Sequence, residues 1–225
     1  MVSAAPQTRK IEAGPRDGNL AIMVYELTTL DGSLASLRAL TEGAHDWLRH
    51  SSGGTLLGSW RTEVGALGRI VVLRDFETRH QLSAERRRAL TSRDPFNGGP
   101  ALRALSMETY EGFPFLPQAR PRQLGGLYEV RTYVLKPGGL TPTLEAWEKA
   151  VEPAKDYTDH LVTNMFATDG PSRITHIWGF ESMQQRAALR ERYQAAGLWP
   201  PKGAPDLIAT ATSSIMLPNP GSPLS

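Results

Sequence analysis

The chain has 225 residues, 40% of them apolar, with 25 basic and 23 acidic side chains and no cysteine. This composition is enough for a globular core and excludes disulfides, thiolate nucleophiles and cysteine-bound metals. The charges nearly balance and form no extended basic stripe, which argues against a nucleic-acid partner, and no run of about 18 apolar residues suggests a membrane-spanning helix. Residues 1–20 lack the apolar segment of a secretory signal, so we expect a disordered leader and a cytoplasmic protein.

An internal repeat organises the rest of the chain. Residues 24–30 read VYELTTL and residues 127–133 read LYEVRTY, an offset of 103, and residues 69–77 align with 173–181 at an offset of 104. Two matches at nearly equal offsets are best explained by duplication of one unit. The predicted organisation is a leader at 1–20, a first repeat at 21–113, a linker at 114–125, a second repeat at 126–218 and a tail at 219–225.

The first repeat shows strand and helix patterns in the order strand, helix, strand, strand, helix, strand. Asp31-Gly32-Ser33 supplies a turn with capping residues before the first helix. Gly65 and Gly68 suit a hairpin, and the breaker cluster at 94–100 ends the second helix. The predicted strands are 22–30, 55–63, 68–76 and 104–112, and the predicted helices are 33–50 and 78–91.

The second repeat follows the same order. Its predicted strands are 127–135, 161–168, 173–180 and 206–217, and its predicted helices are 141–157 and 182–196. The order βαββαβ is the ferredoxin-like unit of the α+β class, an antiparallel sheet with helices on one face. Two such sheets can cover each other, or each can pair with a second subunit, and either arrangement encloses a space.

Two segments of the second repeat carry a family resemblance. Residues 128–138, YEVRTYVLKPG, resemble the opening strand and turn of a NIPSNAP repeat. Residues 176–182, HIWGFES, followed by Arg186 and Arg190, resemble that family's third strand and following helix. The resemblance covers residues 22–218 and implies a dimeric α/β-barrel-type fold made of two tandem repeats. Monooxygenases, isomerases and haem enzymes share that fold, so the resemblance does not supply a reaction.

Alternation sorts the side chains of strand 127–135 onto two faces. The more apolar face, which we expect the helices to cover, comprises Tyr128, Val130, Thr132 and Val134. Glu129, Arg131 and Tyr133 would then point to the open face, about 6–7 Å apart, where they could hold an anion or move a proton. The simpler interpretation is that Glu129 forms an ion pair that serves the fold. Glu26 is the matching carboxylate of the first repeat.

His176 shares a strand face with Ile174, Trp178 and Phe180, and this face would either meet the helices or line the cavity. In a cavity His176 would suit a general base or an axial haem ligand, whereas in the core it would be a hydrogen-bonded structural histidine. No second histidine or carboxylate stands at metal-ligand spacing, so we expect no metal site and no cofactor. Trp199, on an irregular segment, would cover a cavity mouth or an interface.

Three functions fit these patterns. The first is binding of a small apolar or aromatic molecule in a cavity between the β-sheets, and an enzyme of this kind would be a cofactor-independent, monooxygenase- or isomerase-like acid–base catalyst. Its expected catalytic residues are His176, Glu129 and Tyr133, and its expected substrate-binding residues are Arg131, Trp178 and Glu26. The alternatives are a non-enzymatic interaction module with a filled barrel and a haem-binding barrel. Because exposed strand edges invite pairing, we also expect a homodimer.

Overall fold

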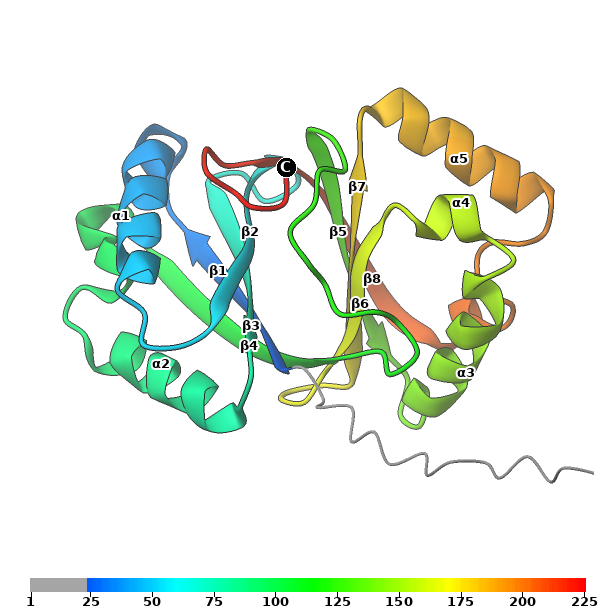
Figure 1. Cartoon of the computed structure of the whole chain (residues 1–225), viewed down its shortest axis with the longest axis horizontal. Helices are drawn as coiled ribbons and strands as arrows, with labels where there is room; N and C mark the ends of the chain where they lie inside the picture. Colours follow the sequence, from blue (N-terminus) through cyan, green and yellow to red (C-terminus); the bar gives the residue numbers. More distant parts are fainter. Residues whose placement is uncertain (1–23) are drawn as a thin grey trace, which may run out of the picture.

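A closed barrel of eight antiparallel strands forms the centre of the molecule (Figure 1). The computed structural model describes residues 24–225, and the predicted leader lies outside the described residues. The first repeat comprises β1 (Val24–Asp31), α1 (Leu37–Arg49), β2 (Thr55–Val64), β3 (Arg69–Phe76), α2 (Arg79–Thr91) and β4 (Ala104–Gly112). The second comprises β5 (Leu127–Leu135), α3 (Leu140–Val151), α4 (Lys155–Thr158), β6 (Leu161–Ala167), β7 (Arg173–Phe180), α5 (Met183–Ala195) and β8 (Ile208–Pro218). The predicted fold class, tandem ferredoxin-like repeats of the α+β class, is confirmed.

Each repeat contributes one four-stranded sheet, and two short seams join the sheets. The first strand of each repeat is central, because β1 pairs with β3 and β4 while β5 pairs with β7 and β8. One seam joins β2 to the end of β8, and the other joins the last residues of β4 to those of β6. The two sheets therefore cover each other within one chain. The strand edges that suggested a homodimer are joined to each other at these seams. The homodimer therefore stays a prediction, and exposed strand edges no longer support it.

Two of the differences from the predicted boundaries lie at prolines. The helix expected at 141–157 is divided into α3 and α4 on either side of Pro153. Pro153 has no backbone N–H to donate to the carbonyl of Lys149, and the backbone leaves the helical region at Ala154 (φ −106°, ψ 31°), which accounts for the break. The closing strand begins at Ile208 instead of residue 206, because the short 3₁₀ helix η4 (Ala204–Leu207), with Pro205 in its first turn, precedes it.

Apolar side chains from both sheets fill the barrel interior. The Trp60 and Tyr128 rings, one from each repeat, lie 5.2 Å apart at their centroids in this cluster. The C-terminal segment, red in Figure 1, passes between the two sheets at one end and buries Leu224 in the same cluster. It is fixed there by Asn219, whose Nδ2 donates to Ser59 Oγ at 2.9 Å. The space between the sheets is thus occupied by the protein's own side chains.

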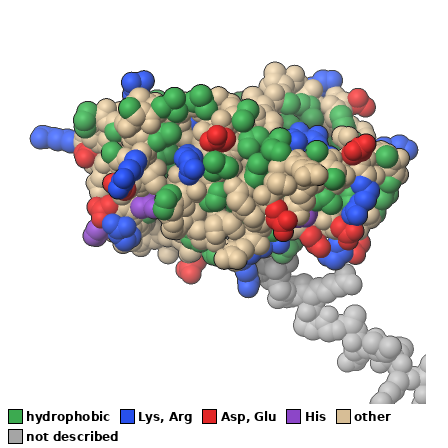
Figure 2. All heavy atoms as spheres, turned by 90° about the horizontal axis from the view of Figure 1, so that it is seen from above, with side chains coloured by type: hydrophobic (Ala, Val, Ile, Leu, Met, Phe, Trp, Pro, Cys, Tyr) green, Lys and Arg blue, Asp and Glu red, His purple; other side chains and the backbone are tan. Residues whose placement is uncertain are grey.

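The helices lie on the outer faces of the barrel. α1 and α2 cover the sheet of the first repeat, and α3 and α5 cover that of the second (Figure 1). Acidic and basic side chains are interspersed on the face that Figure 2 shows, without a patch of one sign. Among the described helices, none combines the length and apolarity needed to cross a bilayer.

Candidate functional site

The polar row of β5 lies on the face that the helices cover, so the predicted assignment of the two faces is wrong. Tyr128 and Val130 belong to the cluster inside the barrel, whereas Glu129 accepts hydrogen bonds from Arg186 of α5. The physical reason is that the barrel interior is closed by apolar residues of both sheets, while α5 brings the cations that a buried carboxylate needs. The expectation that this row lines a space between the sheets is wrong as well.

Glu129 is the anionic centre of this outer face, and its side chain is fully buried. Arg186 binds it with two nitrogens, Nη2 at 2.6 Å from Oε1 and Nε at 2.9 Å from Oε2. Arg131 Nε and Ser213 Oγ donate to Oε1 at 2.9 and 2.7 Å. Burial alone would raise the pKa of Glu129, but the hydrogen bond from Arg186 and the charge of Arg131 outweigh burial and lower the pKa to about 2. The carboxylate is therefore ionised at neutral pH and fully engaged in ion pairs.

His176 is buried beside this network with one ring nitrogen engaged. Trp178 Nε1 donates to His176 Nδ1 at 2.6 Å. Because an indole N–H can only donate, Nδ1 accepts and the neutral imidazole carries its proton on Nε2. Burial, followed by the charge of Arg131, lowers the pKa of His176 to about 3, so the ring is neutral at physiological pH. Nε2 has no hydrogen-bond partner within residues 24–225, which leaves one buried donor free.

A cavity of about 210 Å³ lies between the outer face of β5 and β7, the helices α3 and α5, and the segment before β8. Three predicted site residues line it: Arg131, Tyr133 and His176. Trp147 of α3 and Trp199 form an aromatic wall, with perpendicular rings 4.9 Å apart. The placement of Trp199 agrees with the cavity-mouth alternative. The remaining lining residues are Leu135, Thr143, Ile174, Arg190, Gln194, Pro200, Pro201, Ala204, Pro205 and Ile208.

The other three predicted residues do not line this cavity. Glu129 lies behind it and holds Arg131 in place. Trp178 packs behind His176 and stacks on Tyr157 at 4.5 Å. Glu26 belongs to the first repeat, where it forms a separate network. The structure thus brings five of the six residues into one region and places the sixth elsewhere.

Sequence reasoning gave no role to the residue that completes the site, Arg190. Its guanidinium lines the cavity from α5, and Nη1 lies 3.8 Å from Glu129 Oε1. A signal was available, because Arg186 and Arg190 are four residues apart on a predicted helix and must share a face. Two arginines on the helix face that meets a sheet indicate a buried carboxylate on that sheet. Trp147 both packs in the core and lines the cavity.

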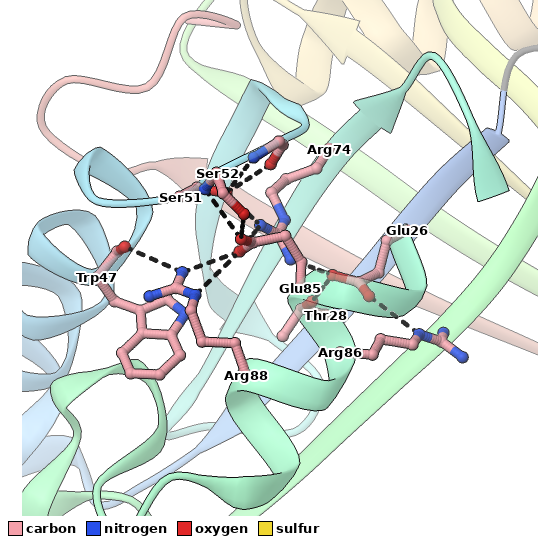
Figure 3. Close-up of polar contacts among 10 residues, drawn as sticks. Glu26, Thr28, Trp47, Ser51, Ser52, Arg74, Glu85, Arg86 and Arg88 are labelled. Carbon is pink, nitrogen blue, oxygen red and sulfur yellow. Dashed lines mark hydrogen bonds and ion pairs between the residues drawn. The ribbon is translucent and has the colours of Figure 1, made fainter. Parts of the chain in front are cut away.

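The first repeat buries its matching carboxylate in a different network (Figure 3). Glu26 accepts from Arg74 Nη2 at 2.6 Å and from Arg86 Nε at 3.0 Å. A second carboxylate, Glu85 of α2, accepts from Arg88 Nη2 at 2.9 Å and lies 3.4 Å from Arg74 Nη1. The arginines of this network therefore meet two buried carboxylates.

The region of the first repeat that corresponds to the cavity is occupied by Phe96. By the repeat offsets, the counterparts of Tyr133, Thr143, Trp147, Ile174 and His176 are Leu30, Leu40, Ala44, Ile70 and Val72. All five counterparts pack in one buried cluster around Phe96. The Phe96 ring also stacks on Trp47 at 5.6 Å, and the guanidinium of Arg88 lies 3.8 Å from the Trp47 ring centroid. The first repeat thus fills with its own side chains the region that the second repeat leaves open.

Neither a metal nor a haem fits the candidate site. Within residues 24–225, no group of three or more His, Asp or Glu side chains is arranged to hold a metal ion. His176 Nδ1 already accepts a hydrogen bond from Trp178. The cavity of about 210 Å³ is smaller than the roughly 300–1,000 Å³ usual for pockets that bind drug-sized ligands, and a porphyrin is at least as large as such a ligand. The donors present are guanidinium and imidazole N–H groups, which suit an organic anion better than a cofactor metal.

Comparison with known proteins agrees with the repeat structure. The family model described as NIPSNAP matches residues 128–223. A NIPSNAP family protein from Agrobacterium tumefaciens is 36% identical over 45% of this chain and 95% of its own, with a TM-score of 0.40. Mouse Protein NipSnap homolog 2 is 25% identical over 76% of this chain, which spans 63% of that relative's length. The structure of an anthrone oxidase-like protein matches 88% of this chain and 91% of its own with a TM-score of 0.65 at 10% identity, a likeness of fold alone.

Proposed function

Because the chain belongs to the NIPSNAP family and folds as a tandem barrel with a packed interior, we propose that it binds a small apolar or aromatic molecule in the cavity of its second repeat. The observation that carries the proposal is an aromatic-walled cavity of about 210 Å³ with a free buried donor, His176 Nε2. A dry apolar cavity of about 150 Å³ accepts benzene. The volume here therefore suits a single aromatic ring with a small substituent.

The protonation states of the three expected catalytic residues favour binding over acid–base catalysis. Glu129 is ionised and held by arginines, and His176 is too weak a base to take a proton at neutral pH. Burial raises the pKa of Tyr133 despite the nearby charge of Arg131, so the phenol stays protonated. We therefore propose that His176 and Tyr133 contact the ligand through the imidazole donor and the phenol ring, and that Glu129 acts indirectly by holding Arg131 at the cavity.

Filling the cavity tests this proposal. Ala204 is buried in the cavity wall, and Ala204→Leu would occupy the space of a ligand. The matched control is Ala188→Leu on the exposed face of α5. The probes are three monocyclic aromatic compounds: phenylacetate, phenylacetamide and benzyl alcohol. Binding of each probe is measured as the shift that it causes in the unfolding temperature of the protein. A ligand at 100 times its Kd stabilises the folded state by roughly 2.7 kcal/mol.

We expect at least one probe to stabilise the wild-type protein and Ala188→Leu equally, and to have little effect on Ala204→Leu. Equal stabilisation of Ala204→Leu would place the binding site elsewhere. If none of the probes binds the wild-type protein, the proposed function fails.

A further inference from the structure

The cavity carries more positive charge than the protein itself neutralises. Glu129 faces three guanidinium groups, those of Arg131, Arg186 and Arg190, and the residues that line the cavity include no carboxylate. Arg186 and Arg131 donate hydrogen bonds to Glu129, but Arg190 reaches it only at 3.8 Å. One carboxylate therefore offsets three cations, and Arg190 is the one most weakly held.

Arg190 and His176 both line this cavity, and each has a buried donor without a partner in the described part of the chain. Arg190 Nη1 and His176 Nε2 are buried and have no hydrogen-bond partner among residues 24–225. A buried donor left without a partner destabilises the folded protein, and more so when it is charged. Burial, followed by the charge of Arg131, lowers the pKa of Arg190, which shows how poorly its charge is compensated. A ligand that brings a negative charge and two acceptor oxygens would relieve both costs.

We infer that the ligand of this cavity is a monocyclic carboxylic acid bound as its anion, with the carboxylate on Arg190 and His176 and the ring against Trp147 and Trp199. This inference rests on the proposed function and adds the chemical class of the ligand. A guanidinium matches the two oxygens of a carboxylate in one plane, and the free imidazole N–H provides a further donor. A phosphate would bring more acceptors and charge than these free donors match, and its inorganic form would leave the aromatic wall uncovered.

The first repeat shows what this arginine position does when the protein supplies the anion. Arg86 corresponds to Arg190 at the offset of 104, and the two side chains have similar exposure, 22% and 21%. Arg86 Nε donates to Glu26 at 3.0 Å, and its Nη1 lies 3.5 Å from Asp169 on the β6–β7 turn. Arg86 therefore has carboxylates on two sides, although its Nη2 has no hydrogen-bond partner among residues 24–225. In the second repeat the ligand supplies the carboxylate that Arg190 lacks. A substitution of Arg86 is therefore a matched control for the same substitution of Arg190.

The test compares phenylacetate with phenylacetamide, which has nearly the same shape without the charge. Calorimetric titration at pH 7.5 measures both affinities in the wild-type protein, Arg190→Gln, Arg190→Lys and Arg86→Gln. We expect the wild-type protein to bind the acid at least about tenfold more tightly than the amide, a difference of roughly 1.4 kcal/mol. Arg190→Gln should abolish this preference, because it weakens the binding of the acid and leaves the binding of the amide unchanged. Arg190→Lys should retain part of it, and Arg86→Gln all of it.

Each outcome decides a separate point. Equal affinity for acid and amide overturns the carboxylate inference and leaves the proposed function standing, whereas no binding of either, or of benzyl alcohol, overturns both. Loss of the preference in Arg86→Gln and not in Arg190→Gln would move the anion site to the first repeat and overturn the inference. Circular dichroism checks that each variant is folded. If Arg190→Gln does not fold, the acid-to-amide ratio in the wild-type protein decides alone.

Discussion

The two repeats bury a carboxylate at the same position and neutralise it in opposite ways. Glu26 lies opposite Arg74 on the neighbouring strand, whereas Glu129 lies opposite Trp178. In the first repeat the neighbouring strand therefore supplies a cation directly. In the second repeat the cations come from Arg131 and α5, and the neighbouring strand supplies an aromatic ring that engages His176. One change of residue type at a strand position thus separates a network whose arginines meet two buried carboxylates from one whose arginines share Glu129.

The same contrast extends to packing. In the first repeat Phe96 occupies the space between sheet and helices, and small Ala44 on α1 leaves room for it. In the second, Trp147 stands at the position of Ala44, and Trp199 packs edge-on against it. These two rings form one wall of the cavity, whereas the corresponding region of the first repeat is filled by Phe96. Duplication followed by divergence has therefore kept the barrel while changing what each outer face can hold.

The largest expected effect distinguishes the two carboxylates. Glu129→Gln removes the carboxylate that three arginines face within residues 24–225, and breaking a buried ion pair costs roughly 3–5 kcal/mol. Glu26→Gln should cost less, about 2 kcal/mol, because Arg74 keeps Glu85 as a partner. Urea unfolding followed by both circular dichroism and tryptophan fluorescence measures the two free energies and checks that the transitions coincide. A cost for Glu26→Gln as large as that for Glu129→Gln would contradict the contrast in charge balance.

A pH effect of intermediate size belongs to His176. Its folded pKa of about 3 lies below the unfolded value of about 6.5, so the unfolded chain binds a proton that the folded protein refuses. Its contribution to stability is complete above pH 6.5 and is lost as the pH falls toward 3. Between pH 7.5 and 5 we expect the wild-type protein to lose about 2 kcal/mol more than His176→Gln. His45, whose pKa burial also lowers, is present in both proteins and cancels.

Urea titrations at several pH values give these stabilities. The contribution of ionised Glu129 to the free energy of unfolding is also lost in acid, but only as the pH falls below the unfolded pKa of about 4.3. Between pH 7.5 and 5 the difference between the two proteins therefore reports on the histidine. Parallel stability curves for the two proteins over this interval would mean that His176 is protonated in the folded state.

The smallest effect compares the equivalent arginines. Arg86→Met breaks a hydrogen bond to Glu26, whereas Arg190→Met removes a looser contact, 3.8 Å from Glu129, and relieves repulsion with Arg131. Since the two side chains are equally exposed and the change is the same, we expect Arg86→Met to be less stable than Arg190→Met by about 1 kcal/mol. Thermal and urea unfolding without ligand give the difference. A larger cost for Arg190→Met would show that the protein already compensates this charge.

Much of the fold could be predicted from the sequence, because the repeat offsets and strand alternation are local patterns. The strands 104–112, 127–135 and 173–180 coincide with β4, β5 and β7. The closure of the barrel within one chain could not be chosen over pairing with a second subunit, since both arrangements bury the same sheet faces. The break at Pro153 was visible in the sequence and was outweighed by the helical spacing around it.

The site was predicted less well, for a definite physical reason. Alternation divides the residues of β5 into two sets, but it does not say which set meets the helices. We placed the apolar Tyr128 and Val130 under the helices, whereas they fill the barrel and Glu129 meets α5. The polarity of the partner decides the face, and here the partner helix carries Arg186 and Arg190. Reading the arginine spacing on α5 together with Glu129 would have given the correct face.

If the second repeat binds a carboxylic acid and the first does not, the five tryptophans should respond differently to the ligand. Their indole N–H signals are assigned by single Trp→Phe variants and followed by ¹⁵N NMR during titration with phenylacetate. Trp147 and Trp199 line the cavity, whereas Trp47 packs on Phe96 in the first repeat and Trp60 lies inside the barrel. We predict saturable shifts of Trp147 and Trp199 with Trp47 and Trp60 unchanged. Shifts confined to Trp47 or Trp60, or none at any tryptophan, would contradict the claim.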